Sequence, residues 1–208
     1  MIPLIIDCAG KQVVIFGGGK VAARKAGRFC QEADVLIVSR SISDQCTILP
    51  VRFCQKDITT LSDADIEQII APAFLVVGTL PDLRMNDRIG QICNKQGILF
   101  NNADGTTGDV IIPAVTRGDH YLIALSTGGD SPAVSRFLRE EIESRFPALD
   151  AMIELQHRLR DNLKKTGMPQ AQRSAILHDV LRDKTIWDKL MKSPEDALID
   201  VQQRYLHD

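Results

Sequence analysis

The chain has 208 residues, of which 44% are hydrophobic and 25% charged, and its formal net charge is −2 at pH 7. This composition supports an ordinary core in one domain, or in a large and a small one, and gives no general attraction to nucleic acid or to a membrane surface. No apolar stretch approaches the roughly 20 residues of a membrane span, and the N-terminus lacks the cationic start of a signal peptide. We therefore expect a soluble, cytoplasmic protein.

The cysteines give no sign of a disulfide framework or of a metal site. They are odd in number and scattered, with no CxxC pair and no Cys/His cluster, so we expect reduced thiols that serve in packing. The five are Cys8, Cys30, Cys46, Cys54 and Cys93.

Short apolar runs alternate with helical patterns in the first half of the chain. This alternation is typical of a parallel α/β sheet, and near-continuous apolar strands indicate burial on both faces. We predict a Rossmann-like, doubly wound parallel sheet. Its expected strands are Leu4–Ile6, Val13–Phe16, Val35–Val38, Val51–Cys54, Phe74–Val77 and Ile98–Phe100, and its expected helices are Val21–Gln31, Ala64–Ile70 and Leu83–Gln96.

The pattern changes after Asn101. Two further strands, at Val110–Ile112 and Tyr121–Ser126, are predicted on either side of a polar turn, and Ser131-Pro132 is a good start for a helix that ends near Phe146. The rest is charged and helical, with breaks at 167–169 and 193–194. We expect three parts: the Rossmann domain at 1–113, a small α/β region at 114–147 and a helical region at 148–208.

The segment QVVIFGGGKVAAR at residues 12–24 carries the most information about function. A strand that enters a glycine turn and is followed at once by a helix is the setting of a dinucleotide-phosphate site. Gly17 permits the sharp turn, Gly19 lets the backbone approach a pyrophosphate, and Ala22 allows close helix–strand packing. We predict that the pyrophosphate lies on Gly17, Gly18, Gly19, Lys20 and Val21, at the positive end of the helix dipole.

Two more loops at the carboxyl ends of strands are expected to face the same ligand. Ser39 and Arg40 stand where an acidic residue commonly holds the ribose. Serine can bind a ribose hydroxyl, whereas Arg40 either pairs with a 2′-phosphate or faces solvent, so the residues leave NAD and NADP both open. Thr79 follows a strand where small residues leave room for a nucleotide, but an ordinary turn explains it equally well.

The segment Asn101-Asn102-Ala103-Asp104 contains the best candidate for a catalytic group. Asp104 follows a predicted strand and should emerge at the rim of the nicotinamide side, where a partly desolvated carboxylate can accept a proton. The alternative is a structural turn, since Asp-Gly is a common turn dipeptide.

Ser126, Thr127 and Gly128 precede a predicted helix and form a second candidate anion cradle. Arg117 lies before them, and Arg136 and Arg139 lie on the helix that follows. These side chains suit a substrate with several carboxylates; the alternative is a solvated helix face on which the arginines pair with Glu140, Glu141 and Glu143.

The chain resembles the precorrin-2 dehydrogenase family, which is also the dehydrogenase module of siroheme synthase. The matching stretches span about residues 3–146. They are Pro3-Leu4, the glycine loop with Val21-Ala22 and Arg24-Lys25, Thr79, Asn86, Asn101-x-x-Asp104, Ile112-Pro113-Ala114, and the run from Ile123 to Pro132 followed by Arg136-x-x-Arg139-Glu140.

The resemblance implies NAD-dependent oxidation of precorrin-2 to sirohydrochlorin by a homodimer, whose dimerisation region is 114–147. It places the cofactor near Asn101 as well as on the glycine loop, and it maps the family's catalytic aspartate onto Asp104. Some members also insert iron into the product; the departure at Gly105 and the lack of a histidine cluster leave this activity open. A non-catalytic dinucleotide-sensing module is the alternative class.

Overall fold

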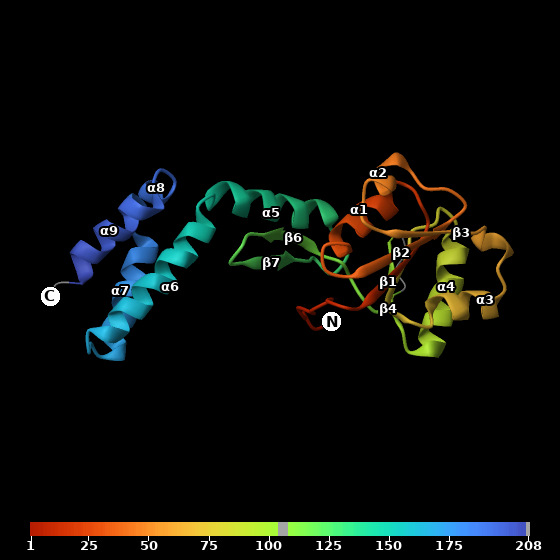
Figure 1. The fold of residues 1–208 in the computed structure, drawn as a ribbon, viewed down its shortest axis with the longest axis horizontal. Helices are drawn as coiled ribbons and strands as arrows, with labels where there is room; N and C mark the ends of the chain where they lie inside the picture. Colours follow the sequence, from red (N-terminus) through yellow and green to blue (C-terminus); the bar gives the residue numbers. More distant parts are fainter. Residues whose placement is uncertain (104–107, 207–208) are drawn as a thin grey trace. The chain divides into compact units, whose positions relative to one another are not determined.

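The computed structural model describes residues 1–103 and 108–206 and divides the chain into two compact units, Met1–Ile112 and Pro113–Asp208. The first unit is built on a five-stranded sheet whose neighbouring strands are all parallel, in the order β3-β2-β1-β4-β5. This confirms the predicted doubly wound α/β fold (Figure 1). The strands are β1 (Gln12–Phe16), β2 (Asp34–Ser39), β3 (Arg52–Gln55), β4 (Ala73–Gly78) and β5 (Leu99–Asn102).

Helices cover both faces of this sheet because side chains of successive strand residues point to opposite faces. Val13 and Ile15 of β1 enter one core with α1 (Lys20–Phe29) and α2 (Asp44–Thr47), whereas Val14 and Phe16 enter a second core on the other face. The second core includes η1 (Ile58–Thr60), α3 (Asp63–Ile70) and α4 (Leu83–Gln96). Figure 1 shows α1 and α2 on one side of the strands and α3 and α4 on the other.

The sequence marks the ends of these helices. Asp82 accepts a hydrogen bond from the backbone of Arg84 at the start of α4, and Gly97 ends the helix with φ +69°. Ser62 and Asp65 form a reciprocal capping box at the start of α3. Two short elements, α2 and η1, have no counterpart in the predicted list because each lies within a single turn, too short for a periodic pattern.

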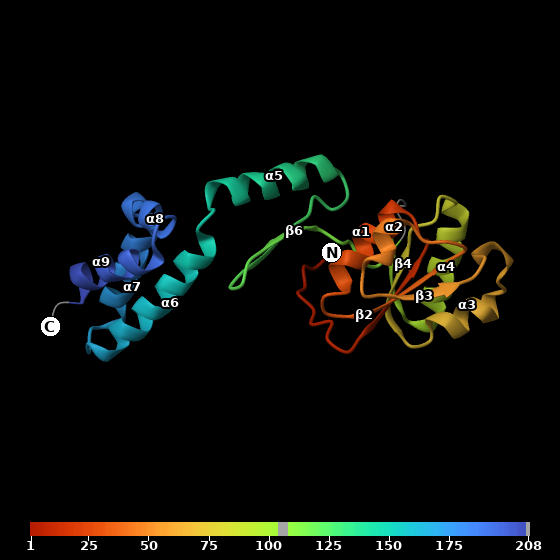
Figure 2. The same ribbon diagram turned by 45° about the horizontal axis from the view of Figure 1, so that its top comes forward.

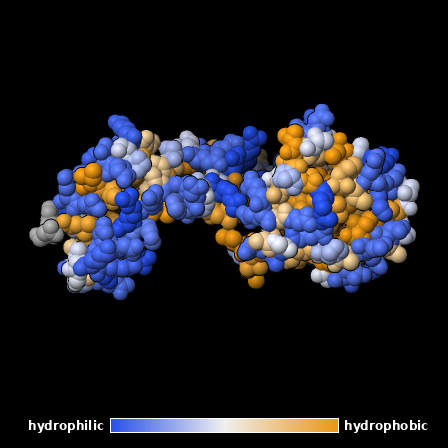
Figure 3. All heavy atoms as spheres, in the orientation of Figure 1, coloured by the Kyte–Doolittle hydropathy of each residue, from blue (hydrophilic) through white to orange (hydrophobic). Residues whose placement is uncertain are grey.

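Two predicted strands are wrong. Residues 4–6 form no strand, because this apolar run has no pairing strand among the described residues. Leu4 and Ile5 are 75% and 76% exposed, and Figure 3 shows hydrophobic surface where the N-terminal segment lies. Residues 110–112 also form no strand. Val110 instead donates its N–H to the carbonyl of Phe100, and the run packs against the sheet core. Pro113 has no backbone N–H to donate to a neighbouring strand, so the next strand begins after it, at Ala114.

The second unit starts with an antiparallel hairpin, β6 (Ala114–Arg117) and β7 (Leu122–Leu125), against which α5 (Pro132–Arg145) packs. The start of α5 is as predicted: Ser131 accepts a hydrogen bond from Val134 N, with Pro132 as first residue. The hairpin turn is held by Asp150, whose carboxylate accepts hydrogen bonds from the backbones of Asp119 (3.1 Å) and His120 (2.8 Å).

Four helices form the remainder of the second unit (Figure 2). Their core consists of side chains such as Leu159, Leu163 and Val180, and Gly167, with φ +74°, lies in the predicted break between the first two helices. No helix in the described parts of the chain has both the length and the apolar character to cross a membrane. The helices are α6 (Leu149–Lys165), α7 (Gln170–Arg182), α8 (Lys184–Leu190) and α9 (Pro194–Tyr205).

Candidate functional site

The glycine loop lies at the point where the strand order reverses. β1 is flanked by β2 on one side and β4 on the other, so the chain winds outward from β1 in both directions. Ligands of doubly wound sheets bind beyond the carboxyl ends of the strands at such a point. Phe16, the last residue of β1, is in register with Gly78, the last residue of β4. The loops after these two strands therefore leave the same edge of the sheet side by side.

Gly17 must be glycine for two reasons. Its φ is +115°, which side chains rarely allow, and a Cβ atom would come within 2.4 Å of the Thr79 hydroxyl and 3.0 Å of the Thr79 carbonyl. The backbone N–H of Gly17 donates to Val38 O at 2.9 Å. The turn at Gly17 therefore contacts β2 on one side and the residue after β4 on the other.

Gly18 holds the loop that follows β2. Its carbonyl accepts hydrogen bonds from Ser43 N (2.8 Å) and from the Cys46 thiol (3.6 Å), and a Cβ atom would collide with Ser41 O. Cys46 is completely buried. The prediction assigned this cysteine only to packing; its role against the loop could not be read from the sequence, because it depends on a contact across 28 positions.

Gly19 and the start of α1 lie where the sequence analysis predicts the phosphate site. A Cβ atom at Gly19 would meet nothing within 4 Å, so the glycine leaves open space there rather than avoiding a neighbour. No side chain caps this helix end and its first turn carries no acidic residue. The first N–H groups of a helix lack internal partners, so those at Lys20 and Val21 remain available. The residues present therefore fit a dinucleotide pyrophosphate.

Ser39 is the last residue of β2 and Arg40 follows it, next to the glycine loop. The Ser39 hydroxyl lies 3.1 Å from the position that a Cβ of Gly18 would take. Arg40 has a side chain that is 76% exposed and pairs at 3.8 Å with Asp57. The pKa of Asp57 is lowered chiefly by the hydrogen bond from the Thr59 hydroxyl, then by the Thr59 backbone, with a smaller effect of Arg40. Arg40 is therefore a loosely held cation beside the expected ribose position.

Thr79 ties the carboxyl ends of β1 and β4 together. Its backbone N–H and its hydroxyl both donate to Phe16 O, at 2.9 and 2.8 Å. Next to it, buried Asn86 accepts from Leu80 N and donates to Leu80 O, which fixes the loop after β4. Thr79 thus has a structural role in addition to the predicted contact with the nucleotide.

Asn101 lies at the end of β5 and is 5% exposed. Its amide nitrogen donates to Val110 O at 2.6 Å, and its side-chain oxygen accepts from Lys25 Nζ at 3.2 Å. Lys25 is absent from the predicted site. A usable signal existed: Lys25 follows Ala22 by three positions, so both lie on the same side of α1, the side that faces the sheet.

The predicted catalytic residue, Asp104, lies outside the described residues. The chain on either side of it is anchored. Ala103 N donates to Gly78 O at 3.0 Å, and Gly108 forms an antiparallel bridge with Asn101. Asp109 accepts from Phe100 N at 3.2 Å. The backbone therefore leaves and re-enters the sheet at the carboxyl edge where the glycine loop lies.

The second predicted group lies in the other unit. The Thr127 hydroxyl donates to Ser131 O and accepts from Ser131 N, both at 3.0 Å, and Ser126 Oγ accepts from Gly128 N at 3.1 Å. Gly128 has φ +71°. These bonds shape a tight turn ahead of α5, so the first function of these side chains is to build the turn.

The arginines on α5 pair within their own helix. Arg136 binds Glu140 at 2.8 Å, and Arg139 binds Glu143 at 2.9 Å and Glu140 at 3.1 Å. The hydrogen bond from Arg136 is the main cause of the lowered pKa of Glu140. Arg117 is the last residue of β6 and also has interactions. The structure therefore brings together the predicted cofactor residues in one unit and the predicted substrate residues in another.

Comparison with known proteins agrees with this architecture. A family model described as "Putative NAD(P)-binding" matches residues 4–114. The chain is 39% identical over 201 residues to a precorrin-2 dehydrogenase of Methanosarcina barkeri, which covers 94% of this chain and 89% of the relative. It is 25% identical over 205 residues to siroheme synthase 1 of Pectobacterium atrosepticum, and that match spans 40% of the longer protein.

A solved structure titled "SirC, precorrin-2 dehydrogenase" has the same fold. It aligns with a TM-score of 0.71 over 98% of this chain and 100% of its own, at 21% identity. The match to the NAD(P)-binding family model, the 39% identity over nearly the whole length of a precorrin-2 dehydrogenase and the shared fold lead to one assignment. The chain belongs to the precorrin-2 dehydrogenase family.

Proposed function

We propose that the protein oxidises precorrin-2 to sirohydrochlorin with NAD⁺, a step of siroheme biosynthesis, in the cytoplasm. The observation that carries the proposal is the 39% identity over nearly the whole length to a precorrin-2 dehydrogenase. The glycine loop supports it, because a Cβ at Gly19 meets nothing and the first turn of α1 has neither a cap nor an acidic residue.

The reaction removes two hydrogen atoms from the macrocycle, one as hydride and one as a proton. NAD⁺, when bound, supplies the hydride acceptor. Residues Gly17–Val21 bind its pyrophosphate through backbone N–H groups, Ser39 donates to or accepts from a ribose hydroxyl, and Thr79 and Asn101 line the nucleotide side. Asp104 takes the proton. Holding the reacting groups in place supplies most of the acceleration.

The substrate carries several carboxylates, and the second unit offers basic and hydroxyl groups for them. We assign this role to Arg117, Ser126, Thr127, Gly128, Arg136 and Arg139. The ion pair of Arg136 is exposed and that of Arg139 is partly exposed, so both are weak, on the order of 0.3–0.5 kcal/mol each for spacing i,i+4. A carboxylate of the substrate can replace the helix glutamates at little cost.

A homodimer is part of the proposal, with residues 114–147 as the dimerisation region, 1–113 as the cofactor domain and 148–208 as the helical domain. A two-stranded sheet is marginal by itself, and β6–β7 has no third strand in the described chain. One side of α5 exposes Val134 (46%), Phe137 (58%) and Leu138 (41%). A second copy of the chain that packs on this side would bury them.

The test is anaerobic incubation of the purified protein with precorrin-2 and NAD⁺. We expect stoichiometric formation of NADH and of sirohydrochlorin, each followed by its absorbance. A dinucleotide-sensing module would bind NAD⁺ but would neither bind nor oxidise the tetrapyrrole, so NAD⁺ binding without turnover would contradict the proposal. Iron insertion is measured separately, as conversion of sirohydrochlorin above the spontaneous rate.

A further inference from the structure

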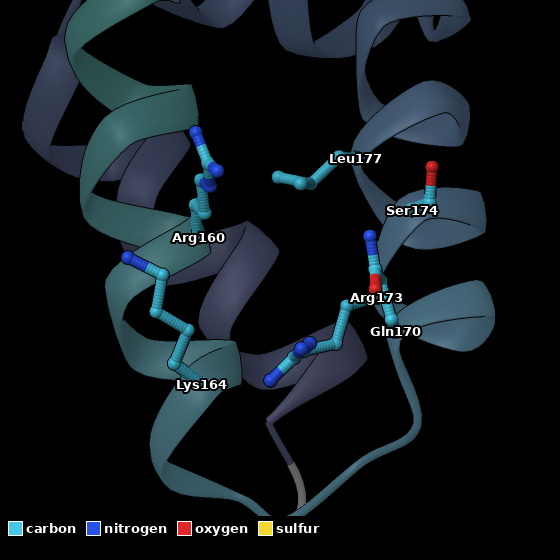
Figure 4. Close-up of a pocket in the computed structure, with 6 residues that line it drawn as sticks. All are labelled: Arg160, Lys164, Gln170, Arg173, Ser174 and Leu177. Atoms are coloured by element: carbon cyan, nitrogen blue, oxygen red, sulfur yellow. The ribbon is translucent and has the colours of Figure 1, made fainter.

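An open cavity lies between α6 and α7, and the proposed reaction does not use it. Its volume is about 250 Å³. Figure 4 shows that the side chains of Arg160 from α6 and of Arg173 and Leu177 from α7 extend into the space between the two helices. The full lining is Arg160, Lys164, Gln170, Arg173, Ser174 and Leu177. Three of the six lining residues are basic and none is acidic.

The two arginines in this cavity differ from others in the same unit. Arg158 on α6 pairs with Glu154 and Glu195, and Arg204 on α9 pairs with Asp183 and Asp200. Within the described residues, neither Arg160 nor Arg173 has an ion pair or a side-chain hydrogen bond. Two guanidinium groups that line one cavity without a carboxylate repel each other. An anion bound between them attracts both, and this attraction outweighs the repulsion.

Lys164 is the third cation of the cavity. Its ammonium binds Asp161 at 2.9 Å, and Figure 4 shows its side chain directed away from the space between the helices. Lys164 therefore adds to the positive potential around the cavity but is already paired. The two arginines are the groups available to a ligand.

The start of α7 adds donors at the same place. Gln170 is the first residue of this 13-residue helix and lines the cavity. No side chain caps the helix and its first turn has no acidic residue. Pro169 O already accepts from the backbones of Gln172 and Arg173, at 3.1 Å each. The N–H groups of Gln170 and Ala171 are left for an anion, which the helix dipole also favours.

We propose that this cavity is a binding site for a phosphate group, free or carried by a small phosphomonoester. A tetrahedral dianion has enough oxygen atoms to accept from two guanidinium groups on opposite helices and from the N-terminus of α7 together. A planar carboxylate has two oxygens in one plane and matches a single guanidinium fork. Two unpaired positive charges also match the charge of a phosphate dianion.

The proposal is tested by calorimetric titration of the full-length protein with inorganic phosphate, at an ionic strength held constant with chloride. NAD⁺ is present at saturating concentration, so that it occupies the phosphate site that we propose on the glycine loop. We expect saturable binding of one phosphate per chain. Arg160→Gln and Arg173→Gln should each weaken binding tenfold or more, because each variant loses a charge-assisted hydrogen bond to the phosphate. Arg182→Gln is the matched control: Arg182 lies on α7, has no ion pair within the described part of the chain and does not line the cavity. It should change the affinity less than twofold.

A second arm separates the two sources of the phosphate group. Tighter binding of phenyl phosphate than of inorganic phosphate indicates a phosphomonoester, and the reverse order indicates free phosphate. Thermal unfolding of each variant, followed by circular dichroism at the helical signal, serves as the check of folding. The proposal is overturned if wild-type protein shows no saturable phosphate binding, if Arg182→Gln weakens it as much as Arg160→Gln, or if citrate binds the cavity more tightly than either phosphate compound.

Discussion

The ammonium group of Lys25 donates to the side-chain oxygen of Asn101 at 3.2 Å, across 76 positions of the chain. This bond joins α1, which follows the glycine loop, to β5, the last strand before Asp104. Asn101 in turn donates to Val110 O at 2.6 Å, beyond the same segment. The helix at the proposed phosphate site and both ends of the segment that carries Asp104 are thereby connected to one buried amide.

Removal of the Lys25 ammonium should loosen this connection. We expect Lys25→Met to lower the free energy of unfolding by about 1.5–3 kcal/mol, the range for a hydrogen bond to a charged group. We also expect a lower kcat, because the segment with Asp104 loses an anchor. Urea denaturation and the NADH assay measure the two effects. Arg24→Met is the control, because Arg24 is the neighbour of Lys25 in the sequence and its side chain is exposed. Equal effects of the two substitutions would contradict the role assigned to Lys25.

Alanine substitutions in the glycine loop should separate folding from cofactor binding. Gly19→Ala places its Cβ in open space, so we expect a change in unfolding free energy of about 1 kcal/mol or less. The methyl group fills the place of the phosphate, and the Kd for NAD⁺ should rise at least tenfold. Calorimetric titration with NAD⁺ and thermal unfolding are the two measurements.

Gly17→Ala provides the contrasting variant. It combines a φ of +115° with a collision against Thr79, so we expect it to lose stability as well as NAD⁺ binding. Normal NAD⁺ affinity in a well-folded Gly19→Ala protein would remove the glycine loop from the proposed cofactor site.

Asp104 is expected to act in the chemical step and not in binding of the cofactor. Asp104→Asn removes the proton acceptor with little change in shape, so kcat should fall by about 10²–10⁴, the usual range for a positioned base. The NAD⁺ affinity should stay within twofold of wild type. Asp109→Asn is the comparison, because its amide oxygen can still accept from Phe100 N. An Asp104→Asn enzyme with wild-type kcat would exclude the assigned role.

The sequence predicted well those parts of the molecule that depend on local patterns. Gly17-Gly18-Gly19 between a strand and a helix, and Ser131-Pro132 at the start of α5, are each specified within a few residues, and the structure has the predicted element in each place. The alternation of apolar residues in β1 likewise reflects burial on both faces.

The sequence predicted poorly those features that depend on contacts between distant segments. The apolar run at residues 4–6 has the composition of a strand but no neighbour to pair with. Cys46 and Lys25 contact the site through Gly18 and Asn101, across 28 and 76 positions of the chain. The helical spacing of Lys25 from Ala22 indicates the side of α1 on which Lys25 lies, but it does not identify Asn101 as its partner. The ion pairs of Arg136 and Arg139 with their helix glutamates were foreseen only as an alternative.

The apolar side of α5 should hold the proposed dimer together. Phe137→Glu places a charge on a side chain that is 58% exposed in the single chain but buried in the dimer that we propose. A buried unpaired charge is costly, so we expect monomers in sedimentation velocity at micromolar protein concentration. Gln203→Glu adds the same charge at an exposed position of α9 and should leave the dimer intact. A dimeric Phe137→Glu protein would locate the interface elsewhere.

The thiol of Cys93 should be unreactive while the protein is folded. Burial, and to a lesser degree the nearby charge of Asp109, raise the pKa of Cys93 from 9.0 to about 12. At pH 8 the thiolate fraction is then about a thousandfold smaller than at a free cysteine, and the thiolate is the species that is alkylated. Mass spectrometry after iodoacetamide treatment should find Cys93 modified only in urea, whereas half-buried Cys54 reacts earlier.

The same shift has a consequence for the pH dependence of stability. A raised pKa in the folded state means that the unfolded chain releases this proton first as the pH increases. The contribution of Cys93 is therefore constant below about pH 8.5, the pKa of an unperturbed thiol, and is lost progressively between that value and pH 12. Cys93→Ser removes this titration. Wild type and variant should accordingly differ in the slope of unfolding free energy against pH only above about pH 8.5, and parallel slopes up to pH 11 would contradict the raised pKa.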